Sequence, residues 1–152
     1  MVHGRHRCGK QQPQSNQPVP EFMQKVNFDE KLALVSDLWS PKVIAEMNDY
    51  QFKLAKVNGE FVWHDHGDTD EVFIVLKGTL YIEFEDRTLS LEQGEMVVVA
   101  KGTRHRPYAE EECCIMLVEP QGVVNTGDGG HDVDESNDGR RGRRTAPNDV
   151  WI

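Results

Sequence analysis

Two histidines separated by one residue form the part of this chain whose residue types and spacing could do chemistry. They lie in the stretch WHDHGDTDE, which runs from Trp63 to Glu71. Side chains two apart on a β-strand point to the same side, so His64 and His66 would face together with their Cα atoms about 7 Å apart. Glu71 would add a carboxylate beside them. On its own this pattern leaves two interpretations open, a metal site and a charged surface turn.

The elements that must position these residues are predicted to be β-strands. Tyr50, Phe52 and Leu54 alternate with polar residues, and so do Leu80 and Ile82. The runs EMVVVA and CCIMLV are apolar and bounded by turn residues. Six to eight short strands with glycine-bearing turns and no alternation with helices predict an all-β sandwich or barrel. The pair Asn58-Gly59 predicts a type I′ hairpin between residues 50–57 and the strand that carries the histidines.

One short helix is predicted before the strands. Asn27 has the character of an N-cap with Glu30 three residues later, and Pro41 is expected to end the helix. Its apolar face would comprise Phe28, Leu32, Val35 and Leu38.

The chain divides by composition into three parts. We expect a flexible, Gln- and Pro-rich N-terminal extension at 1–22, a β-barrel domain at 23–124, and a loosely ordered polar tail at 125–152. The tail contains RRGRR, which would be either an anion-binding patch or a solvated segment, and its closing VWI is apolar enough to dock on the barrel.

Composition excludes several classes of function. The chain has 152 residues with 17 basic and 26 acidic side chains, a net charge of −9, which argues against nucleic acid and anionic membranes as partners. No apolar run reaches the roughly 18 residues of a membrane span, and the N-terminus has no apolar core of a secretory signal. Three cysteines form no disulfide framework, so we expect a cytoplasmic protein.

The spacing of the histidines resembles the two motifs of the cupins, which are small jelly-roll barrels. The first motif runs Gly, five residues, His-x-His, three or four residues, Glu, six residues, Gly. Here His64, His66, Glu71 and Gly78 match, although Gly59 is displaced by one residue. The second motif runs Gly, five residues, Pro-x-Gly, two residues, His, three residues, Asn. Its three matching positions are Gly94, Gly102 and His105, whereas Ala100 and Ala109 replace its Pro and Asn.

The resemblance implies a cupin jelly-roll (double-stranded β-helix) in which His64, His66, Glu71 and His105 bind one divalent metal. Three imidazoles and one carboxylate suit Fe, Mn, Ni, Co, Cu or Zn and disfavour Ca or Mg. The absence of thiolate ligands argues against a closed structural zinc site. Four ligands on an ion that accepts six leave two positions open, which suits Lewis-acid or dioxygen chemistry.

Other residues have plainer interpretations. Asp65 should point away from the metal, Arg104 and Arg106 are expected to be surface charges rather than a site for an acidic substrate, and of Cys113 and Cys114 one should be in the core and one outward. The residues expected to form the core or the pocket wall are Phe73, Val75, Leu80, Ile82, Phe84 and Met96.

Two functions from different classes remain open. The first is a metal-dependent enzyme on a small organic molecule, of dioxygenase, isomerase or lyase type, whose catalytic residues the sequence does not identify. The second is a non-catalytic cupin that binds a small ligand or retains a metal. The resemblance also implies a homodimer, because cupins commonly pair through N-terminal strands and 43–47 has the character of an edge that needs cover.

Overall fold

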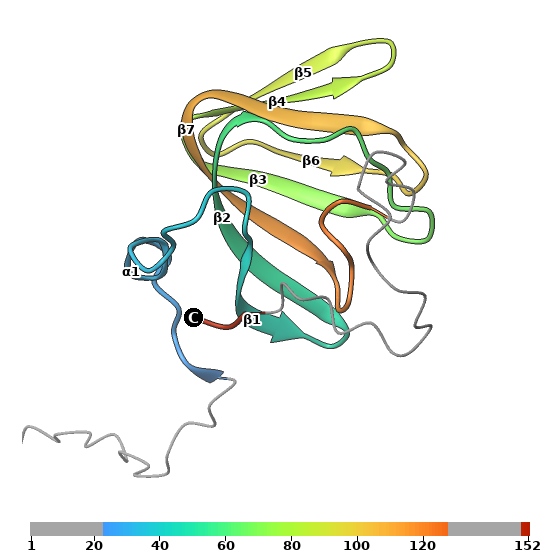
Figure 1. Ribbon diagram of the computed structural model, residues 1–152. Helices are drawn as coiled ribbons and strands as arrows, with labels where there is room; N and C mark the ends of the chain where they lie inside the picture. Colours follow the sequence, from blue (N-terminus) through green and yellow to red (C-terminus); the bar gives the residue numbers. More distant parts are fainter. Residues whose placement is uncertain (1–22, 128–149) are drawn as a thin grey trace, which may run out of the picture.

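Seven strands and one short helix make up the described part of the chain, which is residues 23–127 and 150–152 of the computed structural model. The prediction of an all-β fold with one short helix is confirmed. The elements in chain order are α1 (Phe28–Leu32), β1 (Lys42–Met47), β2 (Tyr50–Glu60), β3 (Glu71–Lys77), β4 (Thr79–Phe84), β5 (Thr88–Glu92), β6 (Met96–Val99) and β7 (His105–Pro120) (Figure 1).

The long strand β7 connects the two halves of the barrel. It pairs antiparallel with β2 along most of its length. Its first residues also pair with β4, and its second half pairs with β3. The sheet order is therefore β1-β2-β7-β3-β6, while β4 and β5 form a hairpin that folds over the other half of β7 (Figure 1). β7 continues without interruption from His105 through the apolar run CCIMLV.

The core lies between the two halves of the barrel. Inward-facing positions of β3, β4 and β7 supply it, as the period of two along each strand requires. The predicted core residues Phe73, Val75, Leu80 and Ile82 are buried there, and Phe84 packs against them. Met96 is an exception because it is 54% exposed. In β6 the inward positions belong to Val97 and Val99, so Met96 points to the outer face.

A second apolar cluster covers the outer face of the sheet. Leu32 of α1 packs there against Leu54 and Met116, and Ile152 packs on the same cluster. This cluster explains the two cysteines. Cys113 and Cys114 do point to opposite faces, but neither is outward, because Cys113 is buried in the inner core and Cys114 in this outer cluster.

The helix α1 is shorter than the apolar pattern predicted. Asn27 is its N-cap, and its side chain accepts hydrogen bonds from the backbone amides of Asp29 and Glu30. The helix ends at Leu32, well before Pro41, because the following residues leave it to run along β2. There the amide of Trp39 donates to the carbonyl of Lys56. Phe28 and Leu38 are consequently exposed, and only Leu32 and Val35 of the predicted face are buried.

The predicted hairpin at Asn58-Gly59 is wrong. β2 continues through these residues, and its pairing with β7 shifts register between Val57 and Gly59, which marks a β-bulge. Gly59 has φ +75°, but Asn58 does not have the positive φ that a type I′ turn requires at both positions. The tight turn lies instead between Met47 and Tyr50, where it joins β1 to β2 and where Asn48 has φ +54°.

The C-terminal residues cover the edge strand β1. The amide of Val43 donates to the carbonyl of Val150, and the amide of Ile152 donates back to Val43. This confirms that VWI docks on the barrel, and it covers part of the edge that residues 43–47 present. The predictions for 1–22 and for RRGRR fall on residues outside those that the structure describes. Among the described residues no helix is long and apolar enough to cross a membrane.

Candidate metal centre

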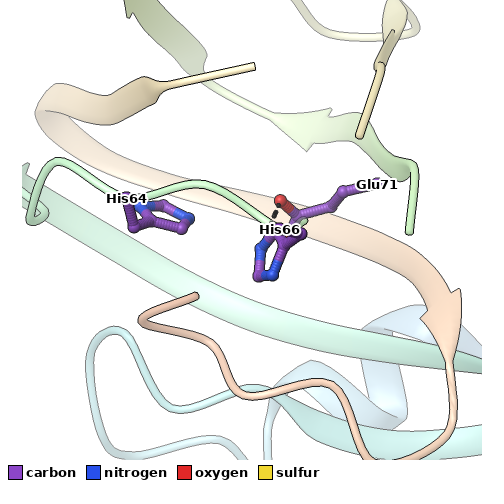
Figure 2. Close-up of side chains that lie close together, drawn as sticks. All are labelled: His64, His66 and Glu71. Atoms are coloured by element: carbon purple, nitrogen blue, oxygen red, sulfur yellow. Dashed lines mark ion pairs between the residues drawn. The ribbon is translucent and has the colours of Figure 1, made fainter. Parts of the chain in front are cut away.

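The histidine pair is positioned by the first residues of β7. After β2 the chain stays extended, and His64 and His105 exchange two backbone hydrogen bonds of 3.0 and 2.9 Å. The carbonyl of His66 accepts a hydrogen bond from the amide of Gly102. These contacts fix the extended backbone, so both imidazoles point to the interior side of the barrel, as the spacing predicted. Glu71 opens β3 and reaches the imidazoles from the other direction (Figure 2).

The four predicted residues lie together and are all buried. The ligand atoms of His64, His66 and Glu71 are within 4.8 Å of one another. The Oε2 atom of Glu71 is 3.2 Å from Nε2 of His66 and 3.4 Å from Nε2 of His105 (Figure 2 shows the first of these contacts). The rings of His64 and His105 have centroids 4.3 Å apart. The structure thus brings together residues that are 41 positions apart in the sequence.

Two imidazoles are held in one orientation by backbone carbonyls. Nδ1 of His64 is 2.9 Å from the carbonyl oxygen of Val62, and Nδ1 of His105 is 2.9 Å from that of Thr103. A carbonyl oxygen only accepts, so Nδ1 carries the hydrogen and Nε2 keeps its lone pair. Among the described residues, the buried Nε2 atom of His64 has no hydrogen-bond partner, whereas Nε2 of His105 faces the carboxylate of Glu71 at 3.4 Å. Metal-binding histidines have this arrangement of a donating and a coordinating nitrogen.

The protonation states suit a cation. Burial, and after it the neighbouring His105, lower the pKa of His64 to about 4. Burial by itself would raise the pKa of Glu71, but interactions with His105 and His66 outweigh it and lower that pKa to about 2. At neutral pH His64 is therefore neutral and Glu71 is an anion, which are the forms that bind metal. The donor set of three imidazoles and one carboxylate thus fits a divalent transition ion.

A small cavity of about 30 Å³ adjoins the cluster. Its walls are mostly apolar and include Trp39, Phe61, Ile115 and Leu117, while its polar lining comes from His64, Glu71 and Asn125. Trp39 and Phe61 stack with ring centroids 4.9 Å apart, and the edge of Phe61 meets the ring of His64. A space of this size holds about two water molecules.

Comparison with known proteins decides the family. The Cupin domain pattern matches residues 52–119, which include all four clustered residues. A cupin-2 domain protein of known structure from Shewanella frigidimarina is 61% identical, with 63% of this chain and 94% of that chain covered and a TM-score of 0.63. The chain is a cupin.

Other relatives extend the comparison. A protein of known structure from Neisseria meningitidis is 33% identical, with 64% of this cupin and 100% of that chain covered and a TM-score of 0.60. The uncharacterized protein YdbB of Bacillus subtilis is 47% identical over 77 residues, which are 50% of this cupin and 68% of YdbB. Hydroquinone 1,2-dioxygenase from Sphingomonas is 14% identical with a TM-score of 0.54, a likeness that concerns the fold alone.

Sequence analysis missed a buried ion pair beside the cluster. Nζ of Lys53 is 2.9 Å from Oε1 of Glu119, and both side chains are 0% exposed. In β2 Gln51 and Lys53 occupy the inward positions, whereas Leu54, one of the alternating apolar residues, packs in the outer cluster. Burial and the charge of Glu71 raise the pKa of Glu119 to about 7, while Lys53 acts in the opposite direction. The sequence of β2 alone does not show which side of the strand faces inward, because residues on both sides are buried.

The charged neighbours of the cluster do not join it. Asp65 is partly exposed on the opposite side of the backbone from His64 and His66, as predicted. Arg106 pairs with Glu83 and Glu60 at 2.5 and 2.9 Å, and its guanidinium lies over the ring of Trp63. These partners neutralise Arg106, which agrees with the surface-charge interpretation.

Proposed function

We propose that this cupin binds one divalent transition metal through His64, His66, Glu71 and His105, and that it catalyses a reaction of a small organic molecule. The observation that carries the proposal is the buried, unpartnered Nε2 atom of His64, directed by the carbonyl of Val62 behind it, beside Nε2 of His105 and the carboxylate of Glu71. An imidazole nitrogen buried without a donor is unfavourable unless a cation or a proton meets it. The bound ion would supply Lewis-acid or dioxygen chemistry, as in an isomerase, lyase or dioxygenase.

The surroundings of the cluster support this role. Glu71 contributes a negative charge, which offsets the charge of the ion in a buried site. The rings of Phe61 and Phe73 meet the imidazoles of His64 and His105 edge to face, so the surroundings of the cluster are largely apolar. The cavity beside His64 and Glu71 gives a ligand access to the same atoms.

Metal analysis is the first test of this proposal. Protein purified without chelators should contain close to one equivalent of Fe, Mn, Ni, Co, Cu or Zn, and His105→Ala purified in the same way should contain far less. Oxygen uptake and product formation are then measured on small diols, enols and sugars with the metal-loaded protein. A wild-type protein that neither retains nor takes up metal would refute the proposal.

A second candidate function is a cupin that binds a small ligand or retains metal without catalysis. The size of the cavity, about 30 Å³, and its apolar walls favour this alternative. Measurement of turnover distinguishes the two functions. A metal-loaded protein that binds small diols, enols or sugars without converting any of them supports the non-catalytic role.

We further propose a cytoplasmic homodimer with the three-part division at 1–22, 23–124 and 125–152. The cytoplasmic location rests on the absence of a disulfide among the described residues, where Cys113 and Cys114 are free and buried. A dimer should give twice the mass of the chain in light scattering at tens of micromolar. A monomer at that concentration would contradict this proposal. Because the C-terminal residues cover part of β1, a dimer would form through another edge of the sheet, such as β6.

A further inference from the structure

The segment after β7 brings one polar side chain to the cavity beside the imidazole cluster. Asn125 lines this cavity together with His64 and Glu71. The two latter residues belong to the proposed metal site, whereas Asn125 comes from a part of the chain that carries no motif. In Figure 2 the segment runs past the imidazoles from the end of β7.

The position of Asn125 is fixed at both ends of its segment. The amide of Gln121 donates to the carbonyl of Asp49 in the β1–β2 turn. At the other end Gly127 has φ +76°, and a Cβ atom there would lie 2.1 Å from the carbonyl oxygen of Asp65. The segment therefore touches the backbone that carries the two histidines, and only glycine permits this approach.

The side chain of Asn125 has an unused acceptor. Its Oδ1 atom is buried and has no hydrogen-bond partner among the described residues. A buried amide oxygen without a donor is unfavourable, so a group that enters the cavity with an O–H would be bound more tightly than one without. The other walls are apolar, and among the residues that line the cavity there is no cation that could pair with an anionic ligand.

We propose that Asn125 orients the molecule that binds beside the imidazole cluster, by accepting at Oδ1 a hydrogen bond from a hydroxyl group of that molecule. The ligand class is then an uncharged, hydroxyl-bearing small molecule. The inference rests on the proposed function for the location of the site, but it assigns to Asn125 positioning and selectivity rather than metal binding.

The test compares two probes that differ by one donor. Hydroxyacetone and methoxyacetone share a carbonyl and a second oxygen, but only the first has an O–H. Their affinities are measured by calorimetry for the wild-type protein, Asn125→Leu and Thr126→Ala, each with and without Co(II). Leucine has nearly the size of asparagine and no acceptor, and Thr126 is a neighbour that does not line the cavity. The visible spectrum of Co(II) reports metal binding separately.

The expected result is specific to one variant. Asn125→Leu should bind Co(II) like the wild type, bind hydroxyacetone about fivefold more weakly, as the loss of one hydrogen bond predicts, and no longer prefer it over methoxyacetone. Thr126→Ala should behave as the wild type. Gly127→Ala should also weaken hydroxyacetone binding, because the added Cβ forces the segment away from Asp65.

Three outcomes would overturn the inference. They are an unchanged preference in Asn125→Leu, a loss of Co(II) from that variant, which would make Asn125 a metal ligand, and a wild-type protein that binds neither ketone. Failure of the proposed function is distinguishable, because a protein that takes no Co(II) still reports on Asn125 through the measurements without metal.

Discussion

At the level of single residues, the sequence predicted the residues of the candidate site but not the residues that surround them. His64, His66, Glu71 and His105 lie on short extended stretches, where alternation determines the side to which each points. The orienting carbonyls of Val62 and Thr103 were not foreseen, because a bond from a side chain to the carbonyl two residues before it depends on local torsion angles. Asn125 was assigned to a polar tail, and nothing in its neighbours marks it as a cavity residue.

The cluster predicts which substitutions remove metal. His105→Ala should reduce metal affinity by more than the roughly 10- to 100-fold that loss of a merely orienting partner costs, because it deletes a ligand nitrogen. Glu71→Gln keeps the shape of the side chain but removes its charge, and should weaken binding less than His105→Ala. Metal content after dialysis against a fixed ion concentration, together with circular dichroism to verify folding, measures both effects.

Asp65→Ala is the matched control, since its side chain is on the opposite side of the same backbone. It should leave metal content unchanged. If Asp65→Ala empties the site while His105→Ala leaves it full, the assignment of the inward face is wrong.

The titration of His64 predicts the proton balance of metal binding. A pKa of about 4 means that His64 is already neutral at pH 6, so it has no proton to release when an ion binds. Fewer than three protons per ion should therefore be released at pH 6, although three imidazoles would bind the ion. Calorimetry in buffers of different ionisation enthalpy counts these protons, and release of three at pH 6 would contradict the buried state of His64.

The same shift has a consequence for folding without metal. The unfolded chain binds a proton at His64 below about pH 6.5, whereas the folded chain does so only near pH 4, so the free energy of unfolding should fall as pH decreases through this range. Glu71 acts in the same direction between its ordinary pKa of 4.5 and its folded pKa of about 2. Glu119, with its raised pKa, acts oppositely between 4.5 and about 7, where it favours the folded state at the lower pH.

At the level of elements, alternation predicted the existence of strands better than their lengths and faces. β4 and β6 lie where the pattern placed them, because each has a clear turn at both ends. β2 is longer than predicted, because a bulge at Gly59 keeps it in the sheet where a hairpin was expected. β7 is longer as well, because it pairs with β2 on both sides of that bulge. The inward face of β2 carries Gln51 and Lys53, and only the pairing with Glu119 on β7 makes that face suitable for the interior.

The buried pair Lys53–Glu119 predicts unequal effects of single and double substitution. Lys53→Met leaves a buried carboxylate without its cation and should destabilise the fold by roughly 3–5 kcal/mol at pH 8, where Glu119 is ionised. The double variant with Glu119→Leu removes both charges and should recover most of that loss. Urea unfolding of the two variants at pH 8 gives the comparison.

The pH dependence provides the control for this pair. At pH 5.5 the carboxyl of Glu119 is largely protonated, because its pKa is about 7, so Lys53→Met should cost less there than at pH 8. An equal cost at both pH values, or a double variant less stable than the single one, would show that Lys53 acts through packing rather than charge.

At the level of the whole molecule, the barrel has an inner core that surrounds the imidazole cluster and an outer cluster that closes one sheet face. The inner core followed from the alternation of apolar residues. The outer cluster did not, because it depends on residues from both ends of the described chain, Val26 and Leu32 before the sheet and Ile152 after it. Such contacts between distant segments have no local pattern in the sequence.

The two ends of the chain should therefore contribute differently to stability. Residues 1–20 are polar and rich in Gln and Pro, so their removal should change the melting temperature by no more than a few degrees.

Deletion of residues 150–152 removes the backbone hydrogen bonds on Val43, the packing of Ile152 in the outer cluster, and the bond from Nζ of Lys31 to the carbonyl of Ile152. Ile152 is partly buried, so its packing contributes less than the about 1.5–3 kcal/mol of a fully buried isoleucine. Since 1 kcal/mol corresponds to about 2–8 °C, this deletion should lower the melting temperature by roughly 5 °C. Differential scanning calorimetry of both truncated proteins, with metal content measured alongside, tests the pair. A larger effect from the N-terminal deletion than from the three C-terminal residues would contradict the assignment of β1 as the edge that the C-terminus covers.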